Sequence, residues 1–93
     1  MKLIEGGIYS SKKHQDMCII YIEKRMDIFI ACCLIKIKNS QFSLNNIQQK
    51  LKCNINNFTT IARKNEKEIE EMVDGYFGKL DENLCQELKK KIL

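Results

Sequence analysis

The residues best suited to chemistry in this sequence are a single histidine and the basic side chains next to it. His14 is the only histidine of the chain, and an imidazole can take up or release a proton near neutral pH. It is therefore a candidate general acid or base. Lys12 and Lys13 precede it directly, and their charges suit phosphate groups. No complete catalytic motif accompanies them, and a lone histidine in a polar loop is more often only solvated.

Other cations extend this candidate surface. Residues 1–65 contain 11 Lys and Arg against 4 Asp and Glu, a net charge of +7, whereas residues 66–93 contain 5 against 8, a net charge of −3. A basic face suits RNA or an acidic protein, but lysines also protect strand edges from aggregation. Arg25 and Arg63 can each hold a phosphate through two hydrogen bonds, or serve only as surface charges. The candidate nucleic-acid-binding residues are Lys12, Lys13, His14, Arg25, Lys36 and Lys38.

The cysteines predict structure rather than chemistry. Their number is odd, and no pair has the spacing of a zinc or redox motif. We expect five buried free thiols in a reducing compartment, with no bound metal and no cofactor. Two of them are adjacent in an apolar run, so on a strand they face opposite sides. The five are Cys18, Cys32, Cys33, Cys53 and Cys85.

The length and composition predict one small domain over residues 1–93. A core of this size favours a shallow groove or an interaction surface over a deep cleft. The longest apolar run, residues 28–35, is too short to span a membrane, and the start does not read as a signal peptide. We therefore expect a cytoplasmic protein without membrane contact. The many Ile, Lys and Asn residues are typical of an AT-rich genome, such as a low-GC bacterium, its phages or its plasmids.

Strands occupy most of the first part of the chain in this interpretation. We predict strands over residues 4–10, 17–23, 28–37 and 58–62, with the second and third forming a central hairpin around the charged segment 23–27. The first eight residues of the third strand are continuously apolar, which indicates a strand covered on both faces.

Three helices are predicted from caps and apolar spacing. Ser43 can cap a helix through residue 52 that buries Leu44, Ile47 and Leu51. Asn65 can cap another whose apolar face is Ile69, Met72, Val73 and Tyr76, with Gly75 and Gly78 limiting its extent. Asp81 can cap the last, with Leu84, Leu88 and Ile92 as its buried stripe. The order predicts an α+β fold, a small antiparallel curled sheet or partly open barrel with a C-terminal helix.

Four segments resemble the MazF/PemK toxin family. They are residues 5–9 (EGGIY), 28–40 (IFIACCLIKIKNS), 60–64 (TIARK) and 76–84 (YFGKLDENL). The resemblance implies an SH3-like barrel that dimerises. It also implies metal-independent cleavage of single-stranded RNA and neutralisation by an antitoxin peptide.

The sequence departs from this family at its catalytic positions. The family uses an arginine at the start of the second strand and a serine or threonine at the end of the central strand. Here those places hold Gln15-Asp16 and Leu34-Ile35, and the long loop before the second strand is missing. Cleavage through the 2′-hydroxyl needs a base and a cation for the developing phosphate charge, which leucine and isoleucine cannot supply.

These departures favour a homodimeric barrel, from a toxin–antitoxin system or another mobile element, that binds RNA or protein and is a weak or inactive nuclease. One alternative is a small protein-binding inhibitor of a host or phage defence factor, which needs no catalytic group. A second is an active, metal-independent endoribonuclease that uses other residues.

Overall fold

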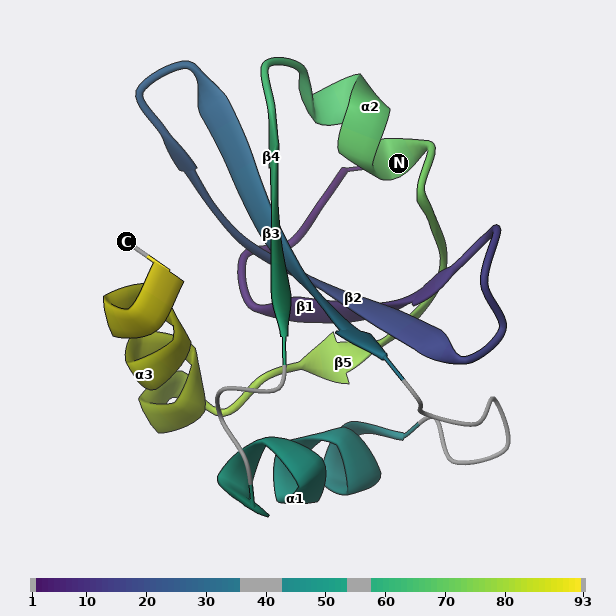
Figure 1. The fold of residues 1–93 in the computed structure, drawn as a ribbon, viewed down its shortest axis with the longest axis vertical. Coiled ribbons are helices and arrows are strands. Elements are labelled where there is room, and N and C mark those ends of the chain that lie inside the picture. Colours follow the sequence, from purple (N-terminus) through teal and green to yellow (C-terminus); the bar gives the residue numbers. More distant parts are fainter. Residues whose placement is uncertain (1, 36–42, 54–57, 93) are drawn as a thin grey trace.

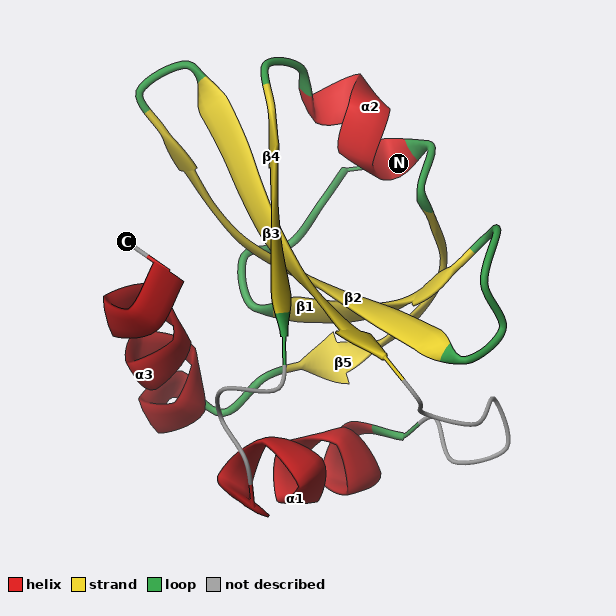
Figure 2. Cartoon of the chain, in the orientation of Figure 1, coloured by secondary structure: helices red, strands yellow, loops and turns green. Residues whose placement is uncertain are grey.

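The computed structural model of the protein describes residues 2–35, 43–53 and 58–92. Within these ranges the chain folds as α+β, as predicted, around an antiparallel five-stranded sheet with the order β4-β3-β2-β1-β5 (Figures 1 and 2). The strands are β1 (Gly7–Ser11), β2 (Met17–Arg25), β3 (Ile28–Ile35), β4 (Thr59–Arg63) and β5 (Val73–Lys79). The helices are α1 (Leu44–Cys53), α2 (Glu66–Glu70) and α3 (Glu82–Ile92). No helix in these ranges is long and apolar enough to cross a membrane.

The predicted β2–β3 hairpin is confirmed and contains the central strand of the sheet. Its turn is shorter than the predicted charged segment, because Arg25 and Ile28 still pair across it. Met26 in this turn has a φ of 57° and is 89% exposed. The pairing extends from Arg25 and Ile28 at the turn to Met17 and Ile35 at the open end. The start of β2 and the end of β3 are therefore adjacent.

Both faces of the sheet are covered, as the continuous apolar run predicts. On one face, alternate residues such as Ile20 and Cys32 pack against Ile47 and Leu51 of α1 and Leu88 of α3. On the other, Ile19 and Cys33 belong to a second cluster with Tyr9, Ile69 and Val73. Cys32 and Cys33 thus lie on opposite faces, as expected for adjacent residues of a strand. Figure 1 shows α1 and α3 on one side of the sheet and α2 on the other.

The helix caps form largely where the sequence predicts them. Ser43 accepts the Asn46 backbone N–H at 3.2 Å through its hydroxyl. Asp81 precedes α3, and its carbonyl accepts the Cys85 N–H at 2.9 Å. Its own N–H donates to Gln48 Oε1 of α1 at 2.6 Å, which links the two helices that cover the first face.

Two predicted elements are wrong at their boundaries. The first strand begins at Gly7 rather than residue 4, because Gly6, at a φ of 76°, forms a turn in which the Gly7 N–H donates to the Ile4 carbonyl. The helix after Asn65 ends at Glu70, and the next residues form β5 instead of continuing it. β5 pairs with the outer edge of β1 and so satisfies backbone groups that a longer helix would leave unpaired. Gly78 lies at a φ of 128°, in the region that favours glycine.

The cysteine prediction needs one correction. All five are free thiols, but Cys53 at the end of α1 is exposed whereas Cys18, Cys32, Cys33 and Cys85 are buried. Burial also raises the pKa of the Cys33 and Cys85 thiols above the ordinary value, so they stay protonated at neutral pH.

Thiol titration with DTNB checks this arrangement. In the native, non-reduced protein at pH 8, we expect about one thiol to react within seconds, because only a thiolate at an accessible position attacks the reagent. After unfolding in denaturant, all five thiols are expected to react. Detection of three or fewer would mean that the chain forms a disulfide bond.

Candidate functional site

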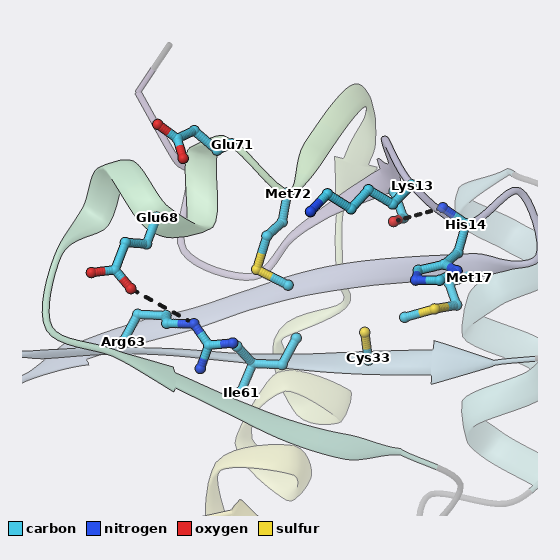
Figure 3. A pocket seen from close by; sticks show the side chains of 10 residues that line it. Lys13, His14, Met17, Cys33, Ile61, Arg63, Glu68, Glu71 and Met72 are labelled. Carbon is cyan, nitrogen blue, oxygen red and sulfur yellow. Dashed lines mark hydrogen bonds and ion pairs between the residues drawn. The ribbon is translucent and has the colours of Figure 1, made fainter.

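A pocket opens on the second face of the sheet, between the β1–β2 loop, β4 and α2 (Figure 3). Its volume of about 650 Å³ lies within the range of small-ligand sites. It brings together side chains that are distant in the sequence. They are Ser11, Lys13, His14, Met17, Cys33, Ile61, Arg63, Glu68, Glu71 and Met72, and we call the site the His14 pocket.

The floor of the His14 pocket is apolar. Cys33 pairs with Ile19, so it is a diagonal neighbour of Met17 on the same face of the hairpin. Ile61 of β4 and Met72, after α2, pack on the same cluster. This floor suits a flat ring or an aliphatic side chain. The raised pKa of the Cys33 thiol, caused by its burial, makes it a poor nucleophile at neutral pH.

The β1–β2 loop supplies one rim of the pocket. The backbone N–H of His14 donates to Ser11 Oγ at 3.3 Å, and the backbone N–H of Lys12 donates to the Met72 carbonyl at 3.0 Å, which ties the loop to the segment between α2 and β5. The His14 side chain is exposed. Its imidazole has no hydrogen-bond partner within the described ranges, whereas a catalytic base is usually oriented by a third group.

The opposite rim contains an ion pair. Arg63 ends β4, and its Nε lies 3.7 Å from Glu68 Oε2 of α2. Both side chains are about half exposed, at 44% and 50%. An exposed pair of this kind contributes at most about 1 kcal/mol, so Arg63 can exchange Glu68 for a phosphate oxygen. Because Glu68 and Glu71 also line the pocket, its rim carries charges of both signs.

The structure separates the residues predicted to bind nucleic acid. Lys13 and His14 line the pocket, and Lys12 is exposed in the same loop without lining it. Arg25 lies at the opposite end of β2 from Met17, roughly 20 Å or more away at about 3.3 Å per residue. Arg25 and His14 therefore do not share one pocket. Lys36 and Lys38 lie outside the described residues.

The two segments that the sequence resemblance aligns with the family's catalytic positions are neighbours in this fold. Gln15 and Asp16 are exposed just before β2, and Leu34 and Ile35 end β3, where they pair with Cys18 and Met17. The His14 pocket begins at this corner of the sheet, since Met17 and Cys33 belong to its floor.

Sequence reasoning missed the other pocket residues because they depend on long-range packing. Nothing local marks Ile61, Met17 or Cys33 as different from core residues. The spacing of Met72 predicts a place on a helix face, but α2 ends before it and leaves it beside the pocket.

The pocket carries no recognisable metal centre. Across residues 2–35, 43–53 and 58–92, no group of three or more His, Cys, Asp and Glu side chains is placed to hold a metal ion. Comparisons of the chain with protein-family models, curated proteins and solved structures found no match. Its function must therefore be argued from its own residues.

Proposed function

We propose that this chain is a MazF/PemK-like protein with an SH3-like barrel that binds single-stranded RNA in the His14 pocket and cleaves it weakly or not at all. One observation carries the proposal. The pocket opens beside the Met17–Ile35 pair, and it offers the cations Lys13 and Arg63, while the positions aligned with the family's catalytic residues hold Gln15-Asp16 and Leu34-Ile35.

The topology supports the fold part of the proposal. Strands β1 to β4 are sequential antiparallel neighbours, and β5 returns to pair with β1. In the sequence, the short α2 connects β4 to β5, and these two strands form the opposite edges of the sheet. This connectivity is compatible with a partly open SH3-like barrel.

The pocket chemistry supports the binding part. A base could lie on the apolar floor formed by Ile61 and Met72, while its flanking phosphates meet Lys13 and Arg63 on opposite rims. At this corner the aligned positions hold Gln15-Asp16 and Leu34-Ile35 in place of the family's arginine and hydroxyl residue, and the His14 imidazole has no hydrogen-bond partner among the described residues. Binding without efficient cleavage follows from this combination.

A protein segment is the second candidate ligand. The mixed charges of Arg63, Glu68 and Glu71 around a methionine-lined floor resemble a protein interface, which has an apolar centre and a polar rim. This observation favours the alternative of a protein-binding inhibitor.

Binding of a fluorescently labelled single-stranded RNA, measured by anisotropy at several salt concentrations, tests the proposal. We expect K13Q and R63Q each to weaken binding by up to about fivefold, because an exposed ion pair contributes up to about 1 kcal/mol. Each is also expected to reduce the salt slope by about 0.7, the value for one phosphate contact on a single strand.

The matched control is K52Q, which removes one exposed charge from α1, on the other side of the sheet. It should change the affinity less than twofold. Equal effects of all three substitutions, or no binding even at low salt, would contradict RNA binding in this pocket and favour a protein ligand.

A further inference from the structure

A second group of basic side chains lies on the other face of the sheet, where the end of α3 meets the β2–β3 hairpin. It lines an open recess of about 400 Å³. None of the lining side chains is apolar, in contrast to the floor of the His14 pocket. The lining consists of Glu23, Arg25, Gln86, Lys89 and Lys90, and we call it the hairpin–α3 recess.

An ion pair holds the two sides of this recess together. Lys89 Nζ lies 3.4 Å from Glu23 Oε1, and the two side chains are only 28% and 22% exposed. This pair is more sheltered than Arg63–Glu68 and is therefore less weakened by solvent. Leu88, the neighbour of Lys89, is fully buried against the sheet. The last turns of α3 are thus anchored beside Arg25, which is far from them in the sequence.

Two cations of the recess remain without an acidic partner. Arg25 and Lys90 are both exposed, and neither forms an ion pair with any part of the chain that the structure describes. Three cations and one carboxylate give the lining a formal charge of +2. An arginine fork beside a lysine suits a phosphodiester, since the guanidinium can make two parallel hydrogen bonds and the ammonium adds a mobile point charge.

We propose that the hairpin–α3 recess binds the phosphate backbone of a single-stranded nucleic acid. An open recess lined only by charged and amide side chains is poorly suited to enclose an apolar ligand, whereas a backbone needs only cations along its path. The recess lies on the α3 side of the sheet and at the turn of the hairpin. The His14 pocket lies on the α2 side and at the open end, so the two sites are separate and the recess can bind whether or not the pocket does.

The test compares R25Q/K90Q with K50Q/K52Q, which removes two exposed charges from α1. Labelled single-stranded RNA and DNA 25-mers of the same sequence serve as probes. At about 3.4 Å per nucleotide they exceed the 32 Å longest dimension of the protein. We expect R25Q/K90Q to weaken binding about tenfold and to lower the salt slope by about 1.4, two contacts at about 0.7 each. K50Q/K52Q should change the affinity no more than about twofold.

The outcomes separate this proposal from the function of the pocket. If K13Q/R63Q binds like the wild type while R25Q/K90Q loses affinity, the pocket proposal fails and the recess proposal stands. If R25Q/K90Q loses affinity for RNA alone or for DNA alone, the recess proposal is supported, and the result shows which of the two nucleic acids the recess binds. Unchanged binding by R25Q/K90Q, an equal loss in K50Q/K52Q, or no binding at low salt would overturn it. Circular dichroism of each variant confirms that the fold is intact.

Discussion

In a metal-free assay, the purified protein is expected to cleave single-stranded RNA at least about 100-fold more slowly than an active enzyme of the resembled family. Loss of one preorganised electrostatic donor commonly lowers a rate by about 100- to 1,000-fold. In the proposed MazF/PemK-like assignment, both catalytic positions hold other side chains. The start of β2 follows Gln15 and Asp16, and β3 ends in Leu34 and Ile35.

His14 offers the remaining route to catalysis, and the structure places Arg63 on the opposite rim of the same pocket. An imidazole acting as acid or base across from a phosphate-binding guanidinium is the arrangement that favours the alternative of an active endoribonuclease. In the structure, however, Arg63 is paired with Glu68 and the imidazole is not oriented by a hydrogen bond from any described residue.

The cleavage assay is therefore run with His14→Ala beside Lys12→Ala, an exposed neighbour that does not line the pocket. Robust cleavage that His14→Ala abolishes and Lys12→Ala preserves would overturn the proposed weak nuclease and make His14 catalytic. Robust cleavage by both variants would show that other residues perform the reaction. Poor cleavage by all three proteins, with binding retained, is the expected result.

The elements that sequence reasoning predicted well are those specified by neighbouring residues. The β2–β3 hairpin follows from β-branched runs on either side of a charged segment. The last helix follows from Asp81 and the spacing of Leu84 and Leu88, both of which are buried. In each case the local pattern and the tertiary packing favour the same structure.

β5 shows where local reasoning fails. Ile69 and Val73 are spaced as on a helix face, and both are fully buried in the second cluster. Their burial is compatible with a helix and with a strand, so the spacing of these two residues cannot distinguish the two structures. The deciding contribution is non-local, since Tyr76 and Gly78 pair with Tyr9 and Ile8 of the first strand. Such pairing overrides a modest helix preference.

The candidate site was only half predictable for the same reason. His14 and Lys13 were recognisable by residue type. That Arg63 would lie across a pocket from them, while Arg25 would lie at the other end of the hairpin, depends on strand register. Met17 and Arg25 lie at opposite ends of β2, a strand of nine residues. The basic residues of the first part of the chain therefore contribute to two separate sites.

Leu88→Ala is expected to lower the free energy of unfolding by about 2–4 kcal/mol. Leu88 is fully buried in the cluster that α3 forms with the sheet and α1, where it packs with Ile22, Ile30 and Leu84. The substitution removes the transfer free energy of the side chain and leaves a cavity that the surrounding helices and strands can only partly close. In a domain of 93 residues this is a large fraction of the total stability. Urea denaturation followed by circular dichroism measures the change.

Glu87→Ala on the same helix is the matched control. Glu87 is exposed, and alanine is a strong helix former, so this substitution should stay within about 0.5 kcal/mol of the wild type. Because the two substitutions are adjacent in α3, a difference between them reports packing of the helix and not its intrinsic stability. A loss below about 1 kcal/mol for Leu88→Ala, or equal losses for both variants, would mean that α3 does not pack on the sheet as described. In that case Lys89 and Lys90 would not be held beside Arg25, and the hairpin–α3 recess would have no fixed geometry.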